Sequence, residues 1–167
     1  NITTVLSPPN PGNLSAFGLH VSDIKRDYIR TIVRRQTSSN HAELLKVWSD
    51  LESLGREEIS REGVEEKAIE SHYSADMRYV GEGHEVPVKV PQGLSKEDAV
   101  LYIWDEFHNV HEKTFGFQYR DQQDVELVNL RVQAVGRAHR PEVSKINNTS
   151  DKLEIDSLRQ VFWRDHG

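Results

Sequence analysis

The segment from Ile69 to Tyr79 alternates apolar and polar residues along most of its length. This period of two predicts a β-strand with one face on a hydrophobic core and the other toward water. A Gly-Glu-Gly turn follows at 81–83, and valines then occupy every second position from 86 to 90. Two such runs joined by a glycine-rich turn predict an antiparallel hairpin. Because Pro87 has no amide hydrogen, the returning strand is expected at a sheet edge or a bulge.

Helical patterns flank this hairpin. Amphipathic stripes follow the N-cap residues Asn40 and Ser95. We expect a further helix over 15–35 and a further long strand over 125–135. Because the strands are neighbours in sequence and segregate from the helices, we predict an α+β fold. Its antiparallel sheet would consist of the hairpin and the further long strand, packed by helices, with truncated flanking segments.

Charge and composition exclude several classes of protein. The net charge is −6, and a chain of this charge without a dominant basic face is a poor candidate for binding nucleic acid. No stretch approaches the ~20 consecutive apolar residues of a membrane span. The chain has no cysteine, which excludes disulfides, thiolate metal sites and cysteine nucleophiles, and which fits a reducing compartment. We therefore expect a cytoplasmic protein that binds neither nucleic acid nor membranes.

One local exception is a basic stretch over 25–35, with five basic residues and one acid. Ile29, Ile32 and Val33 interleave with these charges at helical spacing. We interpret the stretch as the solvated face of an amphipathic helix. The alternative is an interface with an acidic partner or with phosphate.

A pair of histidines, His108 and His111, is separated by one helical turn, so both side chains could reach one metal ion, with Glu112 nearby. However, His111 continues the apolar stripe of its helix, and His108 lies beside the edge of that stripe. This placement favours packing inside the protein. We predict no metal site here.

The hairpin turn is the second candidate site. Asp76 and Arg78 are expected on the wet face of the strand, and the turn presents Glu82, His84 and Glu85. Such a turn could contact an anion or a partner protein. The alternative is a plain hairpin with a cross-strand ion pair. The sequence contains no complete catalytic motif, so the catalytic residues are unknown.

Three stretches together resemble the hydantoinase A (N-methylhydantoinase A) subunit of the ATP-dependent hydantoinase/oxoprolinase family, in its C-terminal part. They are Ser-Pro-Pro-Asn-Pro-Gly-Asn-Leu-Ser-Ala-Phe-Gly-Leu at 7–19, Asp-Met-Arg-Tyr-Val-Gly-Glu-Gly-His-Glu at 76–85, and Val-Asn-Leu-Arg-Val-Gln-Ala-Val-Gly at 128–136. Their order and spacing agree with the family from residue 1 to about residue 140, which is most of the chain.

The resemblance implies an accessory domain of an enzyme that hydrolyses a cyclic amide, such as hydantoin or 5-oxoproline, together with ATP. An amide is a poor electrophile until its oxygen is phosphorylated and becomes a leaving group, which would explain the ATP. Relatives carboxylate ketones, so a domain of an ATP-dependent ketone carboxylase is one alternative. A purely structural scaffold or subunit-docking domain is another.

The resemblance also implies a division into domains. Residues 1–37 would be the closing strand, loop and helix of an upstream actin/Hsp70-like ATPase domain, and 38–140 the α+β C-terminal domain. Residues 141–167 would be a linker and the start of a β-rich module, with a strand over 158–163. The loop that closes the ATPase domain matches at four positions, which are Pro11, Gly12, Ser15 and Ala16.

Cofactor and partners follow from the same resemblance. ATP and Mg²⁺ would be bound upstream of Asn1, so this chain alone is not expected to bind or hydrolyse ATP. The implied partners are the upstream ATPase domain in cis, a hydantoinase B-type subunit and a small cyclic amide. We expect Arg78, Glu82 and His84 to project from the hairpin toward the substrate or a partner. The family often has glutamine where this chain has Glu82, which changes what the turn can contact.

Overall fold

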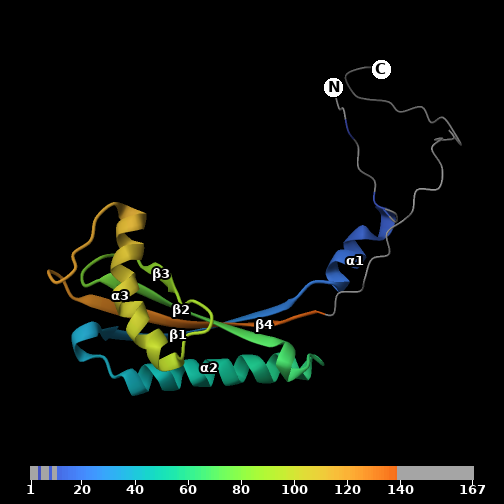
Figure 1. The fold of residues 1–167 in the computed structure, drawn as a ribbon, viewed down its shortest axis with the longest axis horizontal. Coiled ribbons are helices and arrows are strands. Elements are labelled where there is room, and N and C mark those ends of the chain that lie inside the picture. The colour runs from blue at the N-terminus through green and yellow to red at the C-terminus, as the bar shows by residue number, and fades with distance from the viewer. Residues whose placement is uncertain (1–3, 5–7, 9–10, 139–167) are drawn as a thin grey trace, which may run out of the picture.

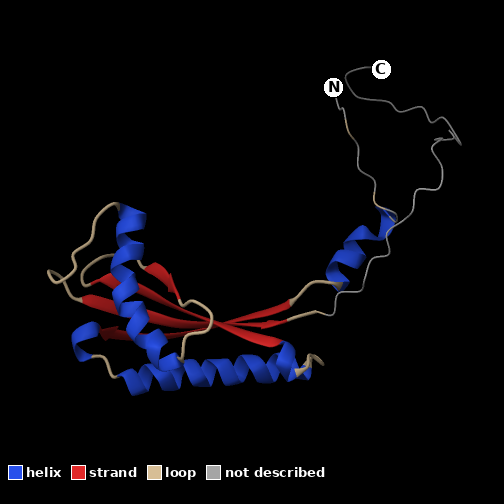
Figure 2. Cartoon of the chain, in the orientation of Figure 1, coloured by secondary structure: helices blue, strands red, loops and turns tan. Residues whose placement is uncertain are grey.

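The structure is a computed structural model that describes Thr4, Pro8 and residues 11–138. The strands β1 (Ile24–Arg35), β2 (Ile69–Tyr79), β3 (Val86–Lys89) and β4 (Val125–Gly136) form one sheet in the order β1-β4-β2-β3. All three pairings are antiparallel, which confirms the predicted α+β fold and the predicted hairpin (Figure 2). The short strand β3, which contains Pro87, lies at a sheet edge as expected.

Two long helices cover the sheet with a shared hydrophobic core. The helix α2 (His41–Arg61) begins at Asn40, whose side chain accepts a hydrogen bond from the Ala42 amide. The helix α3 (Lys96–Phe115) begins at Ser95, whose hydroxyl accepts one from the Asp98 amide. Both helices and the strands β2, β3 and β4 contribute buried residues to one core, which includes Leu44, Trp48, Met77, Val88, Ile103, Phe107 and Leu130. The two predicted caps are therefore where these helices begin.

The helix expected over 15–35 is wrong for most of its length. The helix α1 spans only Leu14–His20, and the basic stretch is the edge strand β1. The spacing of Ile29, Ile32 and Val33 also fits a helix, but β-branched and aromatic residues are frequent here and favour a strand. The strand pairs with β4 from Ile24 to Arg35, with an irregularity between Thr31 and Arg34.

Acidic residues along α2 pair with three of the five basic residues of β1. These basic residues lie on a strand and are not the solvated face of a helix. Four side chains of β1 bond to acids along the helix, in the pairs Arg26–Glu62, Tyr28–Glu58, Arg30–Asp50 and Arg34–Glu43. Positions 26 to 34 of an extended strand span about 26 Å. Positions 43 to 62 of a helix span about 28 Å. The two rows therefore match in length, and three arginines of β1 are paired with acids along the helix.

Several expectations lie outside the described residues. These include the strand over 158–163 and the linker from 141 onward, and the assignment of 1–37 to an upstream ATPase domain stays a prediction. None of the helices within the described part of the chain is long and apolar enough to cross a membrane.

Candidate functional site at the distal end of the sheet

The polar side chains that sequence analysis singled out gather at one end of the sheet. We call this the distal end: β2 ends there at Tyr79 and β4 begins there at Val125. At the opposite end β1 begins and β4 ends, paired through Ile24 and Gly136, and α1 lies beyond them (Figure 1). The distal end also holds the second half of α3 and the loop over 116–124, which connects α3 to β4.

Tyr79 fixes the orientation of His108 inside the core. The Tyr79 side chain is fully buried, and its hydroxyl oxygen accepts a hydrogen bond from the Tyr119 amide at 2.7 Å. The same hydroxyl lies 2.8 Å from His108 Nδ1. Since the amide can only donate, the hydroxyl proton is free to be donated to Nδ1, and burial raises the pKa of Tyr79, which keeps that proton in place. His108 then carries its own proton on Nε2.

His108 is held neutral by its surroundings. Its side chain is only 5% exposed, and burial, followed by the nearby Arg120 guanidinium, lowers its pKa from the ordinary value of 6.5. A neutral ring agrees with an Nδ1 that accepts a hydrogen bond. The Nε2–H group, by contrast, has no hydrogen-bond partner among the described residues.

Because the pKa of His108 is lowered in the folded protein, the folded protein should become less stable as the pH falls. The unfolded chain binds a proton to this histidine near pH 6.5, whereas the folded chain binds it only at lower pH. The free energy of unfolding should therefore fall as the pH drops below about 6.5, by at most ~1.4 kcal/mol per pH unit for this group. Carboxylates with lowered pKa, such as Glu52, titrate below this window. Urea unfolding between pH 7.5 and 5.5 should show a shallower pH dependence for His108→Gln, and parallel curves would contradict the assignment.

His111 is also buried, and both of its ring nitrogens bond to acceptors. Nδ1 lies 3.0 Å from the Phe117 carbonyl oxygen, and Nε2 lies 3.0 Å from a carboxylate oxygen of Glu82. Each nitrogen of the His111 ring thus lies within hydrogen-bonding distance of an acceptor oxygen. Aromatic rings surround it, with centroids 4.7 to 5.5 Å away, and they are those of Tyr79, Phe107, Phe115 and Phe117.

The two histidines are therefore packing residues of the core, as their place on the helix indicated. His111 is 1% exposed. Glu112, the third ligand considered, accepts a hydrogen bond from Gln118. Among the described residues, no group of three or more side chains is arranged to hold a metal ion.

The three residues singled out at the hairpin turn, Arg78, Glu82 and His84, make different contacts. Arg78 bonds to Glu126 on β4 at 2.6 Å and to Glu85 at 3.4 Å, a cross-strand arrangement. Glu82 turns back toward His111. His84 borders a small hollow of about 180 Å³ beside Phe115 and Phe117. Contact of Arg78, Glu82 or His84 with a substrate or a partner stays a prediction.

Two further expectations concern residues outside the turn. Asp76 was expected on a wet strand face, but it is only 6% exposed, because Arg131 and Asn129 of β4 bond to its carboxylate at 2.7 and 2.9 Å. The loop residues Pro11, Gly12, Ser15 and Ala16 are exposed and lie at or next to α1, at the end of the molecule opposite the distal end.

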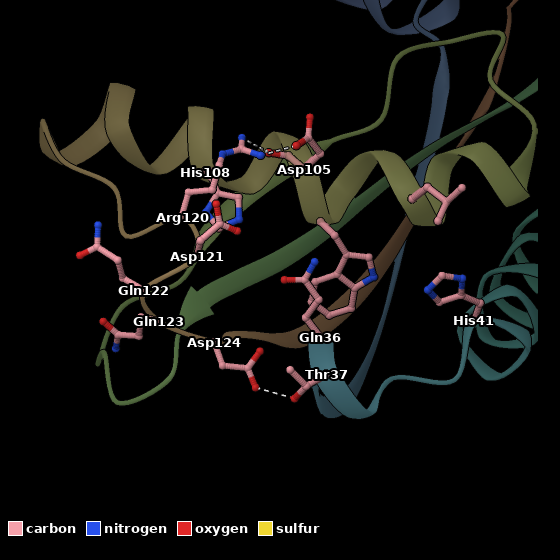
Figure 3. A pocket seen from close by; sticks show the side chains of 12 residues that line it. Gln36, Thr37, His41, Asp105, His108, Arg120, Asp121, Gln122, Gln123 and Asp124 are labelled. Atoms are coloured by element: carbon pink, nitrogen blue, oxygen red, sulfur yellow. Dashed lines mark hydrogen bonds and ion pairs between the residues drawn. The ribbon is translucent and has the colours of Figure 1, made fainter.

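A large cavity opens beside His108, and we call it the distal hollow (Figure 3). Its volume is about 560 Å³, within the range of sites for drug-sized ligands. Three segments line it, from 36–41, from 101–108 on α3, and from 120–124 in the loop. Sequence reasoning missed this site because no single segment carries a motif.

Two polar contacts hold the walls of the distal hollow together. The Thr37 hydroxyl donates to Asp124 at 2.7 Å, which ties the end of β1 to the loop before β4. Arg120 bonds to the carboxylate and the main-chain oxygen of Asp105, which ties the same loop to α3. The Arg120 guanidinium holds the pKa of Asp105 below its ordinary value. The loop over 120–124 is therefore bonded to both of the other segments that line the hollow.

Other polar groups of the hollow are left without hydrogen-bond partners. Trp104 is 4% exposed, and its Nε1–H group is buried with no acceptor among the described residues. Asp121 is exposed, with a φ of 60°, and its carboxylate makes no hydrogen bond or ion pair with the described residues, although it interacts electrostatically with Arg120. Buried polar groups without partners are uncommon in folded proteins, and each calls for an explanation.

Comparison with known proteins places this antiparallel α+β domain in a family. The sequence matches the hydantoinase/oxoprolinase C-terminal domain over residues 32–164. The chain belongs to the hydantoinase/oxoprolinase family, as the three sequence stretches predicted.

Relatives show the same domain in longer proteins. The chain is 28% identical over 145 residues to caprolactamase subunit alpha of Pseudomonas jessenii, and 29% identical over 162 residues to the uncharacterized protein MJ0964 of Methanocaldococcus jannaschii. These alignments cover 85% and 97% of this chain but only 21% and 22% of the relatives. The chain thus spans about a fifth of the length of the curated relatives it matches.

Two solved structures share the fold. The crystal structure of the ATP-dependent caprolactamase from Pseudomonas jessenii has a TM-score of 0.65 at 26% identity, over 84% of this chain and 21% of that one. Nucleotide-free acetone carboxylase has a TM-score of 0.63 at 14% identity, over 83% and 21%. At that identity the second likeness concerns the fold alone.

Proposed function

We propose that this chain is the C-terminal accessory domain of an enzyme that opens a cyclic amide ring with ATP. The observation that carries the proposal is its similarity to caprolactamase in both sequence and structure, combined with membership of the hydantoinase/oxoprolinase family. Caprolactam, hydantoin and 5-oxoproline all contain the same reacting group, an amide within a ring. The substrate is therefore proposed as a class and not as one compound.

ATP and Mg²⁺ are proposed to bind elsewhere in the assembled enzyme. The distal hollow does not fit a nucleotide, because Asp105, Asp121 and Asp124 line it and its one arginine, Arg120, is already paired with Asp105. A triphosphate there would meet like charge. We derive no nucleotide chemistry from the described residues, and we propose an upstream ATPase domain in cis as the source of the site.

The domain is proposed to work as part of an assembly. One relative is named as a subunit, which supports a partner chain, and we propose that this partner is of the hydantoinase B type. We propose that the distal end faces other parts of the enzyme, with the chemistry carried out between them.

An assay of the assembled enzyme tests the proposed function. The full-length protein that contains this chain, with its B-type subunit, is incubated with ATP and Mg²⁺ and with caprolactam, hydantoin or 5-oxoproline, or with acetone and bicarbonate. We expect ADP and ring-opened product to form together from at least one cyclic amide. Carboxylation of acetone, or ring opening that does not require ATP, would overturn the proposal. The 167-residue chain alone should form no ADP.

A further inference from the structure

We propose that the distal hollow receives an arginine side chain carried by another polypeptide of the assembled enzyme. The proposal takes the existence of an assembly from the proposed function. The site itself is argued from the residues of the hollow and does not depend on the reaction that the enzyme catalyses.

The charge of the hollow favours a cation. Three carboxylates line the hollow, those of Asp105, Asp121 and Asp124, with one guanidinium, that of Arg120. Arg120 pairs with Asp105 and also interacts with Asp121. Asp124 accepts hydrogen bonds from the Thr37 hydroxyl and the Val125 amide, and both of those donors are uncharged. The carboxylates that line the cavity thus outnumber its guanidinium groups by two. An incoming guanidinium would supply a counter-charge with the forked geometry that carboxylates bind best.

The helical wall of the hollow suits the flat guanidinium group and the chain that carries it. Trp104 lines the cavity, and indole is the aromatic group that cations favour most. Trp104 and His108 are four residues apart on α3, so they lie on one face of the helix. Each has an N–H group, Nε1 and Nε2 respectively, without a partner in the described part of the chain. The Trp104 Nε1 atom is itself buried, so His108 Nε2 is the donor from which a peptide carbonyl beside the arginine would accept, which favours a polypeptide over a simple amine.

The position of the hollow favours a separate polypeptide. It lies at the distal end, whereas β1 begins and β4 ends at the opposite end of the sheet (Figure 1). Leu101 lines the hollow, is 57% exposed and offers a contact for the aliphatic part of an arginine. The hollow is therefore accessible from outside the domain.

Nuclear magnetic resonance of the 167-residue chain tests the site directly. The probe is the peptide acetyl-Gly-Arg-Gly-amide, and the readout is the indole N–H signal of Trp104, assigned with Trp104→Phe. We expect a saturable shift of this signal with the arginine peptide, a weaker response with acetyl-Gly-Lys-Gly-amide and none with acetyl-Gly-Glu-Gly-amide. An equal response to the glutamate peptide, or no shift, would overturn the proposal.

A matched pair of variants separates the charge of the hollow from general effects. Asp121→Asn should weaken the arginine peptide about fivefold, a typical effect for an exposed charge pair. Asparagine tolerates a positive φ, so the loop should keep its shape. Asp50→Asn on α2, away from the hollow, should leave the affinity unchanged. If the two variants bound the arginine peptide with equal affinity, Asp121 would not contribute to binding the arginine.

The same signal reports whether the chain fills its own hollow. Deletion of residues 139–167 should leave the Trp104 indole signal unchanged when no peptide is present. A shift on deletion would mean that the occupant belongs to this chain, and the proposal of a separate polypeptide would be wrong. None of these outcomes bears on ring opening, which the enzyme assay measures independently.

Discussion

Replacement of Phe107 by alanine is expected to lower the free energy of unfolding by about 3 to 5 kcal/mol, the usual cost of removing a buried aromatic ring. Phe107 is fully buried on α3 and lies edge-on to Tyr79, with ring centroids 4.9 Å apart. It also contacts the rings of His108 and His111. The cavity left by the ring would therefore open at the point where the core meets the candidate site.

Urea unfolding at pH 7.5 measures this loss. Leu101→Ala is the matched control, because Leu101 is on the same helix but is largely exposed. It should change the free energy of unfolding by no more than about 0.5 kcal/mol. Similar losses for the two variants would show that Phe107 is not the centre of this part of the core.

Removal of one oxygen atom in Tyr79→Phe should cost about 2 to 4 kcal/mol. The ring would remain, but the Tyr119 amide would lose its acceptor and His108 Nδ1 its donor, both inside the protein. An unsatisfied buried polar group costs roughly 1 to 3 kcal/mol, and this change leaves two. The loop over 116–124 should also become less well anchored, since Tyr119 belongs to it.

Tyr102→Phe provides the control for this variant. Tyr102 lies on α3 and is only partly buried, and its hydroxyl makes no hydrogen bond to the described residues. Thermal unfolding of both variants, together with amide hydrogen exchange at Tyr119, distinguishes them. Unchanged exchange at Tyr119 in Tyr79→Phe would contradict the hydrogen-bond network described here.

The elements with strong local signals were predictable from the sequence. Asn40 and Ser95 cap their helices, Gly116 ends α3 with a φ of 84°, and the hairpin pairs in the register that its alternation requires. In each case neighbouring residues carry the information. The burial of His111 was predictable for the same reason, because it continues the apolar stripe of α3.

The edge strand and the distal hollow could not be predicted in that way. Whether 24–35 forms a helix or a strand is decided by β4 and by acids of α2 that lie up to 36 residues away along the chain. Asp76 is buried by side chains of β4, more than 50 positions later. The hollow combines three segments of the chain. Its unpaired side chains can be recognised only in the structure, which shows that they make no hydrogen bond with the described residues. Contacts between distant residues leave no local pattern.

The fate of the amide oxygen tests the proposed function most directly. The full-length enzyme, with its B-type subunit, is given ATP and a cyclic amide labelled with ¹⁸O at the carbonyl. If ATP phosphorylates that oxygen, a first water adds to the carbon and the ring C–N bond breaks, which leaves a ring-opened acyl phosphate. A second water then attacks the same carbon, the bond from carbon to the labelled oxygen breaks, and phosphate leaves with the label. We predict one ¹⁸O atom in inorganic phosphate for each ring opened. Label that stays entirely in the carboxylate product, with no acyl phosphate trapped by hydroxylamine, would contradict the proposal.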